Sequence, residues 1–188
     1  SIPGLNNTRS PEDNFDGIAE LTFTSVAERQ IWFEAAGILM DDEHNLFRKA
    51  IGYTTSTGNS ITYIDGIPQG DPNGESGVIK FHVMVKKNPA VTVEAFRRYL
   101  KETFAPQVIK HESVLKFRLH LFDAVDNSRP DAEGVVHSES PESQYHAAYE
   151  IAFRNHLERE RFFSSSEYAG AIREASYYLQ QIRSFPER

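Results

Sequence analysis

Apolar and polar residues alternate in several short segments of the chain, the period-two pattern that predicts β-strands with one buried face. The strongest of these segments is Lys80–Lys86, with the sequence KFHVMVK. The C-terminal residues IRSFPER predict a short strand or an extended tail. The predicted strands are Ile18–Thr24, Ser60–Asp65, Lys80–Lys86, Val114–Phe122 and Tyr145–Phe153.

Between the strands, cap signals predict where helices begin. Ser25 stands three residues before Glu28, a capping-box spacing, and Asn155 and Glu158 repeat this spacing. Thr92 caps another helix, which Pro106 kinks or ends because proline lacks a backbone N–H. The predicted helices run from Ser25 to Gly37, over Asp42–Lys49, from Thr92 to about Pro106, from Asn155 to about Phe163 and over Ser166–Leu179.

Two stretches of the chain repeat each other at a constant offset of 130 residues. Gly17–Phe33 superposes on Ala147–Phe163, and charged and aromatic positions match as well as apolar ones. A shared offset through a strand pattern and a helix start indicates a duplicated βαβ unit. The alternative is a chance similarity of two amphipathic segments.

The predicted elements form three βαβ units, and the last two together give the βαββαβ order of a ferredoxin-like domain. We therefore predict an α+β fold in which helices cover antiparallel sheets. Because the first unit matches the third, a half-unit is missing upstream of Phe15, through truncation or because another subunit supplies it. The predicted parts are a flexible segment 1–14, a half ferredoxin-like repeat 15–66, a linker 67–77, and a ferredoxin-like domain 78–188 with a polar loop 123–143.

Composition and charge narrow the classes of function. The 188 residues carry a net charge of −7 and a pI near 5.5, which argues against a general surface for nucleic acid or anionic membranes. The lack of cysteine excludes disulfides and cysteine-based metal sites, and it is compatible with a cytoplasmic location. No apolar run approaches the roughly 20 residues that span a bilayer. The sequence has no HxH, HExxH, Walker or GxGxxG motif, so we expect neither a metal nor another cofactor.

The clearest strand and helix patterns lie in the segments KFHVMVKKNPAVTVEAFRRYLKETFAP, VLKFRLHLFD and YEIAFRNHLERERFFSSSEY. These segments resemble the EthD-type branch of the dimeric α+β barrel superfamily. The resemblance covers residues 78–188, and residues 15–66 as a half-copy. It implies that two four-stranded sheets face each other as a barrel, so that the chain forms a homodimer or an intrachain pseudo-dimer. Related proteins include polyketide cyclases, decarboxylases and cofactor-independent anthrone oxygenases.

Strand alternation separates the sheet into two faces, one of which is predicted to point at the helices. In related cyclases the ligand cavity lies on that side, where Phe81, Phe117, Tyr145 and Tyr149 would line it. From the helix side Tyr99, Phe104 and Phe163 would close the cavity. The phenols of Tyr145 and Tyr149 would hydrogen-bond an enolate or donate a proton, or both residues are core aromatics.

Phe104 departs from the family pattern. EthD-like helices commonly carry a histidine just before the Ala-Pro at the helix end, and here the sequence is Phe104-Ala105-Pro106. This departure favours a purely hydrophobic pocket or a different base.

The opposite face of the predicted sheet is polar. His82, His120 and Glu150 would form an acid–base cluster there, or a polar seam between two sheets in which Arg118 pairs with Glu150. His111 follows the helix near the cavity mouth, as a base or as an exposed loop residue. The polar face carries Lys80, His82, Met84, Arg118, His120, His146, Ala148 and Glu150.

Three hypotheses for the function follow from the residues and the resemblance. The first is a small cofactor-independent enzyme of polyketide or secondary-metabolite biosynthesis. It would cyclise a reactive polyketide intermediate by aldol or lactone/pyrone closure, or dehydrate or decarboxylate it. The second is a non-catalytic module that binds a hydrophobic ligand or assembles with a partner enzyme. The third is a cofactor-free anthrone-type oxygenase.

Overall fold

The computed structural model describes residues 2–8, 15–35, 43–67, 77–128, 131 and 133–186. Contacts between Cα atoms divide the chain into two units. The first unit comprises residues 1–9, 53–124 and 144–188, and the second comprises residues 10–52 and 125–143. Each unit is described by itself.

The first unit is built on a five-stranded antiparallel sheet with the order β1-β3-β4-β2-β5. Without β1, the order β5-β2-β4-β3 is that of a βαββαβ ferredoxin-like domain, which confirms the predicted α+β fold. β1 extends this sheet by pairing with β3 at its edge. The strands are β1 (Ser60–Asp65), β2 (Ile79–Lys87), β3 (Val114–Leu121), β4 (Ala147–Phe153) and β5 (Leu179–Pro186).

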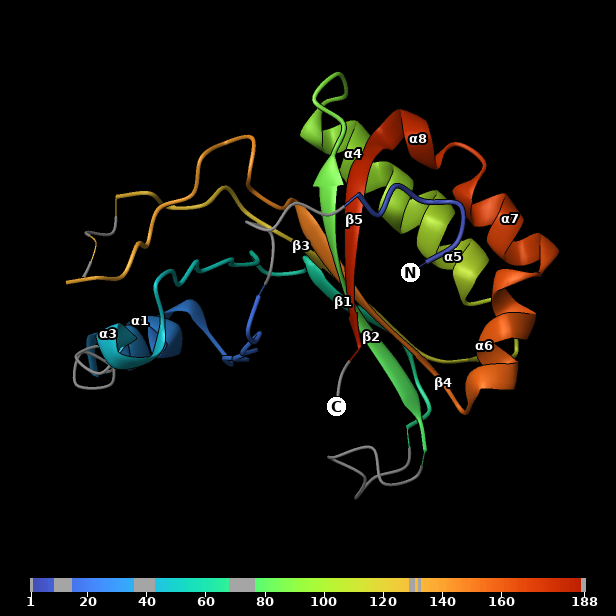
Figure 1. Ribbon diagram of the computed structural model, residues 1–188, viewed down its shortest axis with the longest axis horizontal. Helices are drawn as coiled ribbons and strands as arrows, with labels where there is room; N and C mark the ends of the chain where they lie inside the picture. Colours follow the sequence, from blue (N-terminus) through green and yellow to red (C-terminus); the bar gives the residue numbers. More distant parts are fainter. Residues whose placement is uncertain are drawn as a thin grey trace. The chain divides into compact units, whose positions relative to one another are not determined.

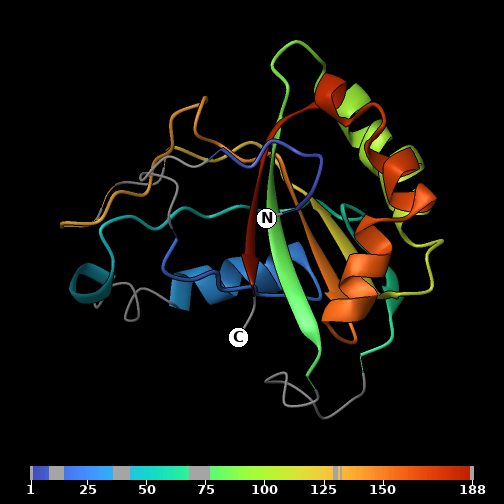
Figure 2. The same ribbon diagram turned by 45° about the vertical axis from the view of Figure 1, so that its right-hand side comes forward.

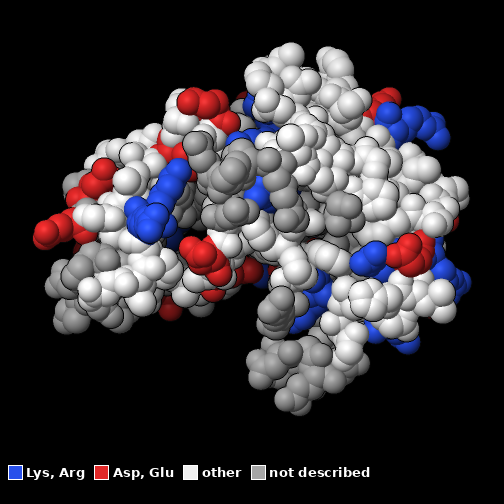
Figure 3. Space-filling model, in the orientation of Figure 1, with Lys and Arg blue, Asp and Glu red and all other residues white. Residues whose placement is uncertain are grey.

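Helices α4 to α8 cover one face of this sheet (Figures 1 and 2). The predicted caps are present, since Thr92 Oγ1 accepts a hydrogen bond from Ala95 N at 3.1 Å and Asn155 Oδ1 accepts one from Glu158 N at 2.9 Å. The helical segments are α4 (Val93–Tyr99), the π-helix η2 (Leu100–Phe104), α5 (Ala105–Val108), α6 (His156–Phe163), α7 (Ser166–Ile172) and α8 (Ala175–Tyr178). The surface of this layer near α6 mixes acidic and basic side chains (Figure 3).

The helix that contains Pro106 continues past this residue to Val108. Its irregularity is the π-helical turn just before the proline, in which Ala105 N donates to Leu100 O five residues back. Because Pro106 has no N–H to offer to Glu102 O, the regular α-helical ladder is interrupted at this point. The predicted kink is therefore a wider helical turn.

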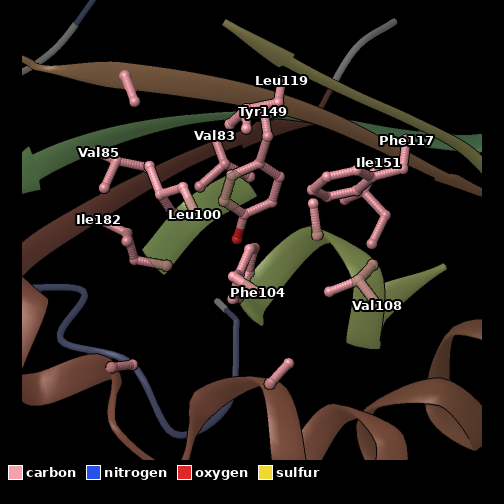
Figure 4. Packing of buried hydrophobic residues seen from close by; sticks show 14 of the residues in the cluster. Val83, Val85, Leu100, Phe104, Val108, Phe117, Leu119, Tyr149, Ile151 and Ile182 are labelled. Carbon is pink, nitrogen blue, oxygen red and sulfur yellow. The ribbon is translucent and has the colours of Figure 1, made fainter. Parts of the chain in front are cut away.

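The core of the first unit lies between the sheet and the helices. Phe104, Phe117 and Leu119 are each at most 1% exposed. Figure 4 shows side chains from strands and helices meeting in this layer. The predicted division of the sheet into an apolar and a polar face is confirmed for residues of β2, β3 and β4.

The second unit contains α1 (Val26–Ala35) and α3 (Glu43–Leu46). The predicted start of the first helix is confirmed: Ser25 Oγ accepts a hydrogen bond from Glu28 N at 3.1 Å. α3 lies within the predicted helix Asp42–Lys49, of which Asp42 falls outside the described residues, as does Gly37. In the same unit Lys49 Nζ pairs with Glu139 at 2.7 Å.

One sequence prediction is wrong in this part of the chain. Residues 18–24, predicted as a strand, form none, and most of them are exposed. A strand requires a hydrogen-bonded neighbour, and Ser60–Asp65, which was expected to close the same βαβ unit, pairs with β3 instead. Residues 2–8, part of the segment 1–14 that was predicted to be flexible, belong to the first unit, where Ile2 is only 3% exposed. The proposal that 15–66 is a half repeat stays a prediction.

Candidate functional site

Tyr149 lies at the centre of the apolar face of the sheet. It is 2% exposed, and its ring lies 5.4 Å from the ring of Phe104 and 5.4 Å from the ring of Phe117. Strand pairing places it between Val83 of β2 and Leu119 of β3. Figure 4 shows its hydroxyl pointing away from the sheet toward the helices. Alternation along β4 thus directs this phenol into the core.

Two further tyrosines bring hydroxyl groups into the same layer from the helices. The hydroxyl of Tyr99 donates a hydrogen bond to Ala171 O at 2.7 Å, and that of Tyr168 donates to Pro3 O. Among the described residues, none makes a hydrogen bond to the Tyr149 hydroxyl. Its capacity to donate is therefore available to a ligand oxygen.

Burial controls the ionisation of these phenols. Burial raises the pKa of Tyr149 well above its usual value of 10.0, and the neighbouring Tyr168 and Tyr99 act in the same direction. The pKa values of Tyr99 and Tyr168 are also raised, chiefly by burial. Tyr149 is therefore a neutral hydrogen-bond donor near neutral pH and not a base.

Phe104 occupies the position at which the family pattern has histidine. It projects from η2 into the core, is 1% exposed, and contacts Tyr149, Phe117 and Tyr99. An aromatic hydrocarbon therefore stands beside the phenol of Tyr149, where the resemblance suggested an imidazole. Phe163 also joins this layer, because its ring lies 4.9 Å from that of Tyr168.

Glu150 organises a polar cluster on the opposite face of the sheet. Its carboxylate lies 3.1 Å from Lys116 Nζ, 3.7 Å from Arg118 Nη1 and 3.6 Å from His120 Nε2, and the residue is 8% exposed. At 3.6 Å the His120 contact is longer than a hydrogen bond. His82 stands directly opposite Glu150 in the β2–β4 register. The predicted pairing of Arg118 with Glu150 is confirmed.

The charge of Glu150 is strongly stabilised. Burial raises the pKa of this carboxyl, but His120 and Lys116 outweigh burial and bring its pKa down to about 2. A carboxylate with such a pKa is a weak base near neutral pH. This geometry favours the polar seam over an acid–base cluster.

Tyr149 and Glu150 are neighbours in β4, so their side chains project from opposite faces of the sheet. A small substrate on one face does not reach the groups on the other. The predicted site residues therefore divide into an interior group and a seam. The interior group is Tyr99, Phe104, Phe117, Tyr149 and Phe163, and the seam is His82, Arg118, His120 and Glu150.

Residues 88–175, which include the interior group, match the family model described as the EthD domain. The chain carries an EthD-type domain. No curated protein matches the chain. Among solved structures, a dimeric ferredoxin-like protein of unknown function from Bacteroides fragilis is 16% identical, with a TM-score of 0.43, over 60% of this chain and 96% of that chain.

Two other solved structures are similar at the same level. An EthD family protein from Bacillus halodurans is 13% identical, with a TM-score of 0.40, over 59% of this chain and 97% of that chain. A putative monooxygenase from Lactobacillus acidophilus is 8% identical, with a TM-score of 0.45, over 69% of this chain and 49% of that chain. Within the described residues, no helix has the length and apolar character to cross a membrane.

Two predicted positions, His111 and Phe81, lie apart from the centre of both groups. His111 accepts a hydrogen bond from Ser113 N at 3.2 Å through Nδ1, and its ring contacts Phe162. Phe81 is partly buried at the edge of the core, where the Arg159 guanidinium lies 6.0 Å from its ring centre.

The predicted orientation of Tyr145 and His146 is wrong. Tyr145 contacts the ammonium group of Lys86 from the polar face and the ring of Tyr53, whereas His146 contacts Phe96 of α4. The regular strand begins only at Ala147, so alternation does not extend to the two preceding residues. Burial, followed by the charges of Lys87 and Lys86, lowers the pKa of His146 to about 4.

The sequence analysis did not select Tyr168 or the N-terminal segment, here defined as residues 2–8. The sequence does hold a signal for Tyr168, because it lies three and four residues before Ala171 and Ile172 on a predicted helix, the spacing of one helix face. A surface pocket of about 320 Å³ lies beside the segment, lined by residues that include Leu5, Asn6, Asn88, Pro89, Leu179 and Ile182.

Proposed function

We propose that the EthD-type domain binds a reactive polyketide or a related aromatic ketone between its sheet and its helices. Tyr149 donates a hydrogen bond to a carbonyl or enolate oxygen of this ligand. The observation that carries the proposal is a buried, neutral phenol that has no hydrogen-bond partner among the described residues, within an aromatic layer. The match of residues 88–175 to the EthD domain supports it.

The proposed reaction is a ring closure of the polyketide by aldol addition. The apolar layer holds the flexible chain in one reactive conformation, which reduces the entropy that the closure must overcome. The enol carbon of one β-keto unit attacks a second carbonyl, and Tyr149 stabilises the negative charge that develops on the oxygen of that carbonyl. The proton lost by the enol ends on the new hydroxyl, so the closure consumes no external acid or base.

A binding module without catalysis is the second candidate. Phe104 favours it, because the group that packs against Tyr149 at this position does not transfer protons. In that case the same site holds the ligand, and Tyr149 contributes affinity only. Formation of a homodimer also remains a proposal, which light scattering of the purified chain tests.

The deciding experiment supplies a reactive polyketide. A polyketide synthase generates the poly-β-keto product in the presence of the protein, and mass-detected chromatography resolves the products. Tyr149→Phe is compared with Tyr177→Phe, because Tyr177 is 64% exposed and lies outside the core. We expect a new cyclised product whose rate of formation falls about a hundredfold in Tyr149→Phe and not in Tyr177→Phe.

Other outcomes of this assay separate the candidates. An unchanged product profile with measurable ligand binding contradicts catalysis and favours the binding module. Oxygen uptake that requires the protein would favour the anthrone-type oxygenase. Equal rates for the two variants would exclude the role given to Tyr149.

A further inference from the structure

We propose that the N-terminal segment is a displaceable plug of the interior site, and that an apolar aromatic ketone takes its place. The carbonyl of this ligand accepts the hydrogen bond that Tyr168 now donates to Pro3. The inference rests on the proposed function, since it concerns the same site. It adds how the closed core admits a ligand, namely by displacement of the N-terminal segment. It also adds that Tyr168 recognises the carbonyl of this ligand.

The first observation is that the plug reaches the core. Ile2 is 3% exposed and belongs to the same buried cluster as Tyr149 and Phe104. The hydroxyl of Tyr168 donates to Pro3 O, and Tyr168 in turn lies close enough to Tyr149 to affect its ionisation. The N-terminal segment thus places an apolar branched side chain and a carbonyl oxygen next to the interior phenols. In Figure 4 the blue chain of this segment runs below the labelled core residues.

The second observation is that the plug has its own internal structure. The Asn7 side chain donates to Ile2 O at 2.9 Å and to Leu5 O at 2.6 Å, which closes residues 2–7 into a compact loop. This loop does not depend on the rest of the domain for these hydrogen bonds. A segment with a local fold can leave and return as a unit, without the ordering cost of a fully flexible chain.

The third observation is that separate hydrogen bonds attach the plug to the domain, among them one that Gln181 Nε2 donates to Thr8 O. The plug lies along the edge strand β5, where Ile182 N donates to Asn6 O at 2.8 Å and Asn6 Nδ2 donates to Gln180 O at 2.9 Å (Figure 1). A paired strand would instead make a continuous ladder. Gly4, with a φ of +73°, passes α7 so closely that a Cβ atom would lie 2.5 Å from Ile172 Cδ1.

The fourth observation is an opening beside the plug. The pocket of about 320 Å³ is lined on one side by Gly4, Leu5 and Asn6, and on the other by residues that include Asn88 and Leu179. Movement of the segment therefore enlarges a space that already exists at the surface. A flat ligand of aromatic size enters from this pocket toward Tyr168.

The experiment measures binding of Prodan, a fluorescent naphthyl ketone whose emission shifts to the blue in apolar surroundings. Ile2→Asp expels the plug, because a carboxylate is not tolerated in the core. Thr8→Asp adds the same charge to the same segment at an exposed position and serves as the control. We expect Ile2→Asp to bind Prodan at least about tenfold more tightly than the unmodified chain. In the unmodified chain only the small fraction of molecules with a displaced plug binds Prodan, whereas in the variant the plug is already displaced.

A second pair of variants tests the recognition of the carbonyl. In the Ile2→Asp background, Tyr168→Phe is expected to weaken Prodan binding about fivefold to tenfold and to reduce the part of the emission shift that reports hydrogen bonding. Tyr177→Phe in the same background leaves both unchanged. A synthetic peptide with the sequence SIPGLNNT is expected to compete with Prodan in Ile2→Asp.

The outcomes decide the proposal. Equal affinity of Ile2→Asp, Thr8→Asp and the unmodified chain would overturn the plug, as would loss of the folded state in Ile2→Asp, monitored by circular dichroism. Gly4→Ala, which loosens the segment without adding charge, should raise affinity in the same direction. If Prodan binds as expected and the polyketide assay yields no product, the plug stands and the proposed catalysis fails.

Discussion

Replacement of Glu150 by Gln tests whether the seam on the polar face is structural. The variant keeps the shape of the side chain and removes the charge that Lys116, Arg118 and His120 surround. The pKa of Glu150 is lowered from 4.5 to about 2 in the folded protein. The folded state therefore holds this proton less tightly than the unfolded state does, and the carboxylate stabilises the fold above the unfolded pKa.

The size of this effect follows from the shift in pKa. At about 1.36 kcal/mol per pKa unit, the lowering corresponds to at most about 3.4 kcal/mol, and partial access of solvent reduces this to about 1–2 kcal/mol. The contribution is fully present at pH 7 and is lost as the pH falls from 4.5 toward about 2. The difference between the unmodified chain and Glu150→Gln should shrink over the same interval.

The assay is urea unfolding followed by circular dichroism at about pH 7 and at about pH 3. Fluorescence is unsuitable, because the single tryptophan, Trp32, belongs to the other unit. Glu102→Gln is the control, since Glu102 is an exposed carboxylate in the same domain. A difference in unfolding free energy that is equal at both pH values would refute the reasoning. Unchanged stability with lost turnover would assign Glu150 to the chemistry.

Three further predictions concern the core, one histidine and one cap. Phe104→Ala should lower the unfolding free energy by about 3–5 kcal/mol, because it leaves a cavity beside Tyr149, and urea unfolding measures this. His146→Gln should reduce the loss of stability between pH 6.5 and about 4, since the lowered pKa of His146 keeps it neutral in the folded state while the unfolded chain takes up a proton. Thermal unfolding of the unmodified chain and of His146→Gln at several pH values measures this. An equal dependence of the two melting temperatures on pH would contradict it. Asn155→Ala should cost about 1 kcal/mol at the start of α6, and an unchanged melting temperature would argue against the cap.

The elements that were predictable from the sequence are those with a local cause. Thr92 and Asn155 form their caps within three residues, and the opposite directions of Tyr149 and Glu150 follow from the alternation of side chains along β4. The predicted strand Ile18–Thr24 failed because strand formation depends on a distant partner, and the pattern of one segment does not identify that partner. The local repeat therefore does not decide the pairing.

The candidate site was predictable to a similar extent. Alternation places Tyr149 in the core and Glu150 on the other face, whereas it fails at Tyr145, where the regular strand has not yet begun. The contact of Pro3 with Tyr168 joins residues 165 positions apart, so no local pattern announces it. The polar composition of the N-terminal segment predicted flexibility, but one apolar residue, Ile2, holds it in the core.

The π-helical turn Leu100–Phe104 sets the rotational phase of the helix. Phe96, Leu100, Phe104 and Val108 are spaced by four residues and are all buried. In a regular α-helix each step of four residues turns the side chain by about 40° beyond a full circle, and the row would drift off the sheet. The wider turn unwinds the helix and returns Phe104 and Val108 to the same side.

Its hydrogen bond spans five residues, so this turn holds one residue more than a turn of a regular α-helix. The exposed positions of the turn are Lys101, Glu102 and Thr103. Deletion of any one of them restores the regular pitch, and Phe104 then follows Phe96 by seven residues, a rotation of about 700° that is only about 20° short of two full turns. Phe104 would therefore stay beside Tyr149. An aligned relative that lacks one residue here would keep the same aromatic face toward the sheet on a regular helix.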